Sequence, residues 1–289
     1  MDPVIREAQQ TDIPGIASWT SDTFSWGDYV ADALPKWISD PSGAVLVAEV
    51  DGEVAGMARV SMVSSSEAWA QGARVHPDHR RTGLGSALTE RLAGWVRERG
   101  ALVLRLAVEH DNETAQRHVE SLGFRPVSDW WEASRLLGEG SPVPEGNGGR
   151  RVQAAERLQE AHSAEAEPAF LSWSAGELAI AARGLFPINW IWRKLTLDHL
   201  DFAARNHALW EGRPGWAMLD IDHDGDLAVY WLETAEADAR AMVRALIDCG
   251  VGRRARQMDM LVPDVGWLRE ALLASAFDLR GSRIYALPL

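Results

Sequence analysis

The chain has 289 residues, a formal net charge of −13 and 46% apolar residues. This length allows one large domain or two of ordinary size, and the apolar share can fill their cores. The negative charge repels nucleic acid phosphates, and no apolar run approaches the roughly 20 residues that span a bilayer. A single cysteine, Cys249, argues against a disulfide framework or a thiolate metal cluster. The first residues lack a secretory signal, so we expect a cytoplasmic protein that binds neither nucleic acid nor membrane.

The first half is predicted to contain both helices and strands. Helical segments within residues 11–38 precede a hairpin that turns at Asp51-Gly52-Glu53. In chain order, the remaining predictions are hairpin strands at 44–50 and 54–63, a strand at 68–75, a helix at 83–99, a strand at 102–108, a helix at 112–122 and a strand pair within 124–137. The long helix carries an apolar face made of Leu84, Leu88, Leu92, Trp95 and Val96.

Residues 138–150, GEGSPVPEGNGGR, combine glycine, proline and serine without apolar periodicity. This composition is typical of a linker. We therefore predict an N-terminal domain over residues 1–138, a linker over 139–150 and a C-terminal domain over 151–289.

The second half repeats the order of elements found in the first. The predicted elements there are a helix at 235–249, a strand at 257–262, a helix at 264–275 and a final strand. Phe124 and Phe277 are 153 residues apart, as are the predicted helix starts at 112 and 265. A constant offset indicates a duplicated domain. The spacing upstream is shorter, which predicts that the second copy has lost about one strand.

Two features of the second half have competing interpretations. The stretch from Asp220 to Gly225 resembles the start of a calcium-binding loop, but Trp231 stands where such a loop needs glutamate. We therefore predict a hairpin turn there and no metal. Seven of the 14 tryptophans follow the linker, and both core packing and an aromatic ligand cage fit them.

The most informative segment joins the predicted strand at 68–75 to the long helix. It reads V-H-P-D-H-R-R-T-G-L-G-S from Val75 to Ser86. Free N–H groups at a helix start attract anions, and glycines let a pyrophosphate approach the backbone closely. Arg80 and Arg81 add positive charge that this acidic chain otherwise lacks. The segment therefore predicts a phosphate-binding loop.

This loop, with its R-x-x-G-x-G pattern, resembles the acetyl-CoA signature of the GNAT (Gcn-five-related) N-acetyltransferases. Residues 112–124, NETAQRHVESLGF, resemble the family's second motif. The resemblance implies an α/β fold: tandem GNAT domains, each a mixed, mostly antiparallel sheet flanked by helices. The second half has no counterpart of the glycine loop, so we interpret it as a degenerate copy.

The resemblance also implies the cofactor and its contacts. Acetyl-CoA would be the co-substrate, and the backbone around Val75 would hold the acetyl carbonyl. Asn112 would bind the pantetheine arm or fix the neighbouring loop. The residues implied for the pyrophosphate are Arg80, Arg81, Thr82, Gly83, Leu84, Gly85 and Ser86. In the family the amine attacks the thioester directly.

One position departs from the family pattern. Many members have tyrosine four residues before the glycine of Gly-Phe, where it protonates the leaving thiolate. This chain has Val119 there, and neighbouring His118 is predicted to point elsewhere on the helix. Glu67, His76 and Glu109 flank the predicted strand ends and are the candidates for a base or proton relay, or else ordinary surface residues.

The acceptor is predicted to be a primary amine of a small molecule, held between the helices of the first half and the second domain. The resemblance implies that the segment before the hairpin, which contains these helices, forms much of the acceptor pocket. Trp26, Asp28 and Tyr29 lie there, and aromatic faces with carboxylates attract cations. The alternative interpretation is that these residues pack and cap helices. An alternative function is a non-catalytic acyl-CoA-binding or sensing protein. The oligomeric state stays open.

Overall fold

A computed structural model describes residues 3–20, 27–137 and 157–289. Trp26 and the predicted linker at 139–150 lie outside these ranges. The chain forms two compact units. The first contains Met1–Val108, Asn112–Pro126 and Tyr285–Leu289, and the second contains Glu109–Asp111 and Val127–Ile284.

The sheet of the first unit follows the order β1-β2-β3-β4-β5. Its strands are β1 (Val4–Glu7), β2 (Gly43–Val50), β3 (Glu53–Met62), β4 (Glu67–Val75) and β5 (Val103–Glu109). The first four strands pair antiparallel, and β4 and β5 pair parallel. The predicted mixed, mostly antiparallel sheet is confirmed.

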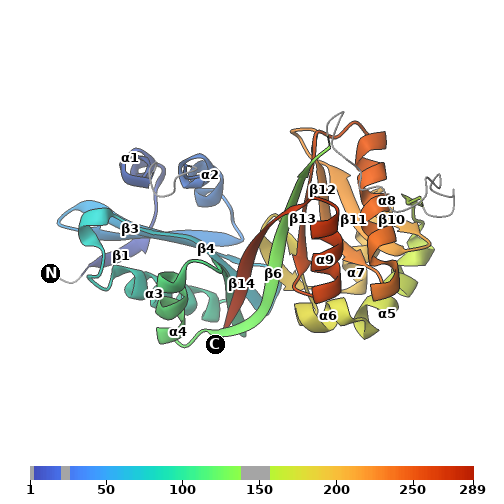
Figure 1. Ribbon diagram of the computed structural model, residues 1–289. Coiled ribbons are helices and arrows are strands. Elements are labelled where there is room, and N and C mark those ends of the chain that lie inside the picture. Colours follow the sequence, from blue (N-terminus) through green and yellow to red (C-terminus); the bar gives the residue numbers. More distant parts are fainter. Residues whose placement is uncertain (1–2, 21–26, 138–156) are drawn as a thin grey trace. The chain divides into compact units, whose positions relative to one another are not determined.

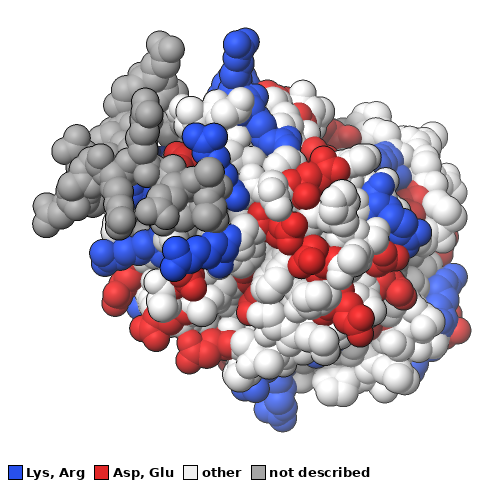
Figure 2. All heavy atoms as spheres, turned by 90° about the vertical axis from the view of Figure 1, so that its right-hand side faces the viewer, with Lys and Arg blue, Asp and Glu red and all other residues white. Residues whose placement is uncertain are grey.

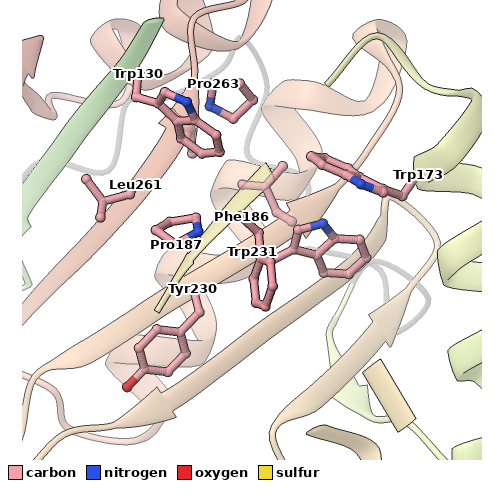
Figure 3. Close-up of a pocket in the computed structure, with 10 residues that line it drawn as sticks. Trp130, Trp173, Phe186, Pro187, Tyr230, Trp231, Leu261 and Pro263 are labelled. Atoms are coloured by element: carbon pink, nitrogen blue, oxygen red, sulfur yellow. The ribbon is translucent and has the colours of Figure 1, made fainter. Parts of the chain in front are cut away.

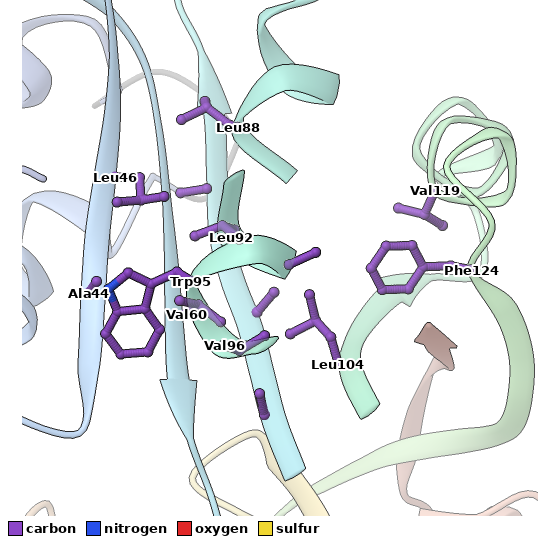
Figure 4. Packing of buried hydrophobic residues seen from close by; sticks show 14 of the residues in the cluster. Ala44, Leu46, Val60, Leu88, Leu92, Trp95, Val96, Leu104, Val119 and Phe124 are labelled. Atoms are coloured by element: carbon purple, nitrogen blue, oxygen red, sulfur yellow. The ribbon is translucent and has the colours of Figure 1, made fainter. Parts of the chain in front are cut away.

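Helices cover both faces of this sheet (Figure 1). They are α1 (Ile13–Thr20), α2 (Val30–Ile38), α3 (Leu84–Arg97) and α4 (Glu113–Ser121). α1 and α2 pack on one face around Ile16 and Leu34. On the other face, α3 and α4 form a larger core (Figure 4). All five residues of the apolar face predicted for the long helix are buried in it.

The end of the chain belongs to the first unit. It forms the last part of β14 (Asp278–Pro288). Tyr285 is fully buried in the core formed with α3 and α4, and its hydroxyl donates to Glu120 Oε1 at 3.1 Å. The N–H of Leu289 donates to the carbonyl of Leu102. The first unit is therefore completed by residues from the far end of the sequence.

The second unit has a sheet in the order β7-β10-β11-β12-β13-β6. Its strands are β6 (Arg125–Leu136), β7 (Gln159–Glu160), β10 (Leu209–Gly212), β11 (Gly215–Ile221), β12 (Leu227–Glu233) and β13 (Gln257–Pro263). Here too the parallel pair, β12 and β13, follows three antiparallel pairings. The remaining elements are α5 (Ala166–Ala175), α6 (Glu177–Ala182), a separate hairpin of β8 (Leu185–Ile188) and β9 (Ile191–Lys194), α7 (Leu197–Arg205), α8 (Ala239–Gly252) and α9 (Gly266–Ala274).

Two predictions about strands are wrong. The region 124–137 holds one long strand, β6, and no strand pair, since the strand runs through Asp129 without a turn. Its carboxylate instead accepts bonds from Arg283 Nε at 2.7 Å and His110 Nε2 at 2.9 Å. The second unit has also lost no strand. The strand that was predicted to be missing is the four-residue β10, which is joined to β11 by the short turn at Arg213-Pro214.

The surface charge and the apolar character of the helices match what the composition predicts. Figure 2 shows acidic side chains across the middle of one face and basic side chains mainly around its edges. Among the described residues, no helix has the length and apolar character that crossing a membrane requires.

Candidate active site

The parallel strands of the first unit separate after a short pairing. β4 and β5 pair only from Glu67↔Val103 to Trp69↔Arg105. β4 then continues for six residues and β5 for four without further pairing to each other. The two strands therefore enclose an opening that ends at Val75.

A bulge in β4 accompanies this separation. Two residues, Gly72 and Ala73, oppose Ala58 of β3. Gly72 has φ +67°, and a Cβ there would lie 2.9 Å from the ring of Trp37, so only glycine fits. Such a bulge bends the strand and changes the direction of the residues after it.

The bulge leaves the backbone of Val75 facing the opening. The N–H of His76 donates to Ala55 of β3 at 2.8 Å. Because successive backbone groups of a strand point to opposite sides, the N–H and carbonyl of Val75 point away from β3. They are therefore available to a ligand between the strands.

The segment between β4 and α3 presents a row of unsatisfied donors. In residues 3–20, 27–137 and 157–289, no acceptor meets the backbone N–H groups of residues 81–86. Arg81 has φ +64° and Gly83 has φ +90° on either side of Thr82. Left-handed residues in such alternation turn successive N–H groups to one side and form an anion-binding concavity. The start of the 14-residue α3 adds its dipole.

Side chains around the concavity complete the site. Arg80 and Arg81 are exposed, and neither forms an ion pair with any described residue. Thr82 donates its hydroxyl to the carbonyl of His79 at 2.6 Å, which fixes the turn. The site thus combines free N–H groups with two guanidinium groups, which suits a pyrophosphate.

His118 lies at this loop, although sequence reasoning placed it elsewhere. A Cβ built on Gly85 would lie 3.3 Å from His118 Nε2 and 4.0 Å from Val75 Cγ2. The end of β4, the start of α3 and the imidazole from α4 therefore converge on one point. Val119 is buried in the core beside Phe124. The helical angle alone did not reveal this arrangement, because it depends on how α4 packs.

Two other predicted residues cap helical turns. Asn112 accepts the N–H of Ala115 at 3.0 Å through Oδ1 and so fixes the start of α4. His76 accepts the N–H of Asp78 at 3.2 Å through Nδ1. When this imidazole is neutral, its proton is therefore on Nε2, where it can be donated.

The two predicted acids lie at opposite ends of their strands. Glu67 begins β4, roughly 25 Å from Val75 by strand rise, and pairs with Arg105 at 2.5 Å. Glu109 is the last residue of β5, beyond the stretch that pairs with β4, and is assigned to the second unit. It faces Glu132 there, and burial is the main cause that raises the pKa of Glu132.

Two residues that were predicted to bind the acceptor already contact Arg74. Asp28 is fully buried, and its two oxygens accept bonds from Arg74 at 2.6 and 3.2 Å. This pair ties the segment before α2 to the end of β4. Tyr29 is 45% exposed, with the Arg74 guanidinium 5.8 Å from its ring centre. Trp19 lies edge-on to His76 at 5.6 Å, which places a further aromatic ring beside the end of β4.

The second unit has a similar strand separation, but it is filled. Pairing of β12 with β13 ends at Val229↔Met260, although both strands continue. Phe186 and Pro187 of β8 lie between them, against Trp231 on one side and Leu261 on the other (Figure 3). The remaining space is about 10 Å³, which is at the lower limit for one water molecule.

The connection from β12 to α8 also has the wrong charge for phosphate. Glu233 ends β12, and Glu236 and Asp238 follow in the connection, where the first unit has Arg80 and Arg81. Glu233 is buried with Oε2 unpaired among the described residues, and burial raises its pKa. Neither the space nor the charge suits a nucleotide there.

Comparisons with known proteins agree with this geometry. Residues 13–124 match the model of the Acetyltransferase (GNAT) family. Acetyltransferase ECA0875 of Pectobacterium atrosepticum is 33% identical over 112 residues, which cover 39% of this chain and 78% of that protein. The structure is similar to a GCN5-related N-acetyltransferase from Sphaerobacter thermophilus, with a TM-score of 0.66, 18% identity and 99% and 95% coverage of the two chains. It is also similar to the glucosamine N-acetyltransferase region of a fungal multi-domain β-N-acetylglucosaminidase, with a TM-score of 0.67, 14% identity and 99% and 38% coverage.

The fold and site thus define an acyltransferase. The chain belongs to the GNAT acetyltransferase family, and its general activity is acetyl transfer.

Proposed function

We propose that the protein transfers an acetyl group from acetyl-CoA to a primary amine of a small molecule. One observation carries the proposal: among the described residues, the N–H groups of residues 81–86 meet no acceptor and the adjacent Arg80 and Arg81 form no ion pair, next to the opening between β4 and β5. Acetyl-CoA has a pyrophosphate for the loop and an extended pantetheine arm for the opening. The thioester carbonyl would then accept a bond from the N–H of Val75.

The proposed reaction needs no covalent enzyme intermediate. The amine nitrogen attacks the thioester carbon, and negative charge develops on the carbonyl oxygen. A donor aimed at that oxygen stabilises the transition state more than the ground state. The carbon–sulfur bond then breaks, the amine nitrogen loses a proton and the thiolate takes one up.

We propose that His118 Nε2 donates the proton that the leaving thiolate takes up, because this nitrogen lies at the point where Val75 and Gly85 converge. His118→Ala should lower kcat with acetyl-CoA while leaving its KM nearly unchanged. The loss of kcat should be smaller with an acetyl thioester of a more acidic thiol, because such a thiol leaves without protonation. The matched control is His223→Ala, since His223 is exposed in the second unit. An equal loss with both thioesters would contradict this role.

The acceptor is proposed to be a small amine because aromatic side chains, Trp19 and Tyr29, flank the end of β4 and attract ammonium groups. The test is release of CoA thiol with a panel of amines that includes glucosamine, amino acids and polyamines, with mass spectrometry of the product. Amine-dependent release supports the proposal. Tight acetyl-CoA binding without turnover of any amine or peptide would favour the acyl-CoA-binding alternative.

A further inference from the structure

The second unit contains a pocket of about 290 Å³ that the proposed acetyl transfer does not use. Its floor consists of three buried apolar side chains, Trp173, Ala179 and Leu195. Phe170 of α5 and Ile180 of α6 form its walls, and Ile180 is 64% exposed. Small-molecule sites are commonly concave and apolar, with a few polar groups that fix orientation, and this volume is close to their lower limit.

Two cationic side chains, Arg183 and Lys194, also line this pocket. Lys194 is one of only two lysines in a chain of net charge −13. Its Nζ donates to the carbonyl of Arg183 at 2.5 Å, which holds the ammonium group at the pocket. A Cβ on Gly184 would lie 3.2 Å from the same Nζ, so glycine there leaves room for it.

Arg183 contributes an available charge. It ends α6 with φ +55°, and within the described ranges it forms no ion pair. A guanidinium group beside an apolar surface binds a carboxylate through two parallel hydrogen bonds, and it is more weakly hydrated than an ammonium group. The pocket therefore offers an apolar interior with positive charge at one end.

We propose that this pocket binds a small carboxylic acid with an apolar body. The body lies against Trp173 and Ile180, and the carboxylate lies between Arg183 and Lys194. Charge complementarity selects the anion, and burial of the apolar body adds affinity in proportion to its area. All the lining residues belong to the second unit, so this site is independent of the acetyl-CoA loop.

The test uses octanoate as the probe in calorimetric titration of the full chain. Arg183→Gln should weaken octanoate binding about tenfold, the size expected for a lost charge-assisted hydrogen bond. Arg183→Lys keeps the charge but loses the two parallel hydrogen bonds, so its affinity for octanoate should lie between those of the wild type and Arg183→Gln. Lys36→Gln changes the chain's other lysine, which lies exposed on α2, and should bind octanoate like the wild type.

A second variant tests the apolar wall. Ile180→Asp adds a negative charge at an exposed position, so it should abolish octanoate binding while the thermal unfolding midpoint stays near that of the wild type. The proposal is overturned if octanoate does not bind at millimolar concentration. It is also overturned if 1-octanol binds as tightly as octanoate, or if Arg183→Gln or Ile180→Asp binds octanoate like the wild type.

Discussion

Gly83 offers the sharpest test of the phosphate-binding loop, through a comparison of Gly83→Asp with Gly83→Asn. No heavy atom lies within 4 Å of a Cβ placed on Gly83, so either side chain has room. Its φ of +90° strains any side chain, which costs about 1 kcal/mol. Asn and Asp tolerate the left-handed region best and are nearly equal in shape. The two variants therefore differ mainly in one negative charge.

That charge would lie beside the bound pyrophosphate. Two like charges 4 Å apart repel by about 1 kcal/mol in water and about 4 kcal/mol at an effective dielectric constant of about 20. Because the loop is exposed, we expect the lower part of this range. Gly83→Asp should therefore bind acetyl-CoA about tenfold more weakly than Gly83→Asn.

The assay is calorimetric titration of acetyl-CoA into both variants at low salt, with urea unfolding as the control. The two variants should unfold within about 1 kcal/mol of each other, since they share the same strain. Equal affinities for acetyl-CoA in folded variants would refute a phosphate site at the start of α3.

Three further results are expected. Tyr285→Ala removes a fully buried ring that bonds Glu120 and should cost about 3–5 kcal/mol in urea unfolding; an unchanged stability would contradict the assignment of residues 285–289 to the first unit's core. Burial raises the pKa of Glu233 above 4.5, so the wild type should lose stability relative to Glu233→Gln as pH rises from about 4 to about 8; a pH-independent difference would contradict this. Finally, calorimetry should give one acetyl-CoA per chain, because Phe186 and Pro187 fill the second strand separation; two would contradict the filled site.

The features predicted well from sequence are those encoded by neighbouring residues. The apolar face of α3 repeats with the helical period, and its five residues are all buried as predicted. The loop before α3 could be predicted because its arginines and glycines lie within six residues, from Arg80 to Gly85. The structure adds the φ values of Arg81 and Gly83, which explain why its N–H groups face one side.

Long-range pairing could not be predicted in the same way. The sequence of β6 does not indicate its neighbours in the sheet, which are β14 and β13. The last five residues have ordinary strand character, and nothing in them indicates a place in the first unit. Pairings between distant segments are set by the total packing of both sheets.

Several predicted roles depended on contacts that the sequence does not show. Asp28 lies in the predicted acceptor segment, but its pairing with Arg74 involves a residue 46 positions away. His118 faces Gly85 only because α4 packs next to the start of α3. Residue type and spacing identified the loop, whereas the orientation of single side chains required the fold.

The most direct test of the account is a crystal structure of the full chain with acetyl-CoA. We predict pyrophosphate oxygens at hydrogen-bonding distance from the N–H groups of residues 81–86, and the acetyl oxygen bonded to the N–H of Val75. We also predict no acetyl-CoA between β12 and β13. Acetyl-CoA bound in the second unit, or away from the start of α3, would contradict the account.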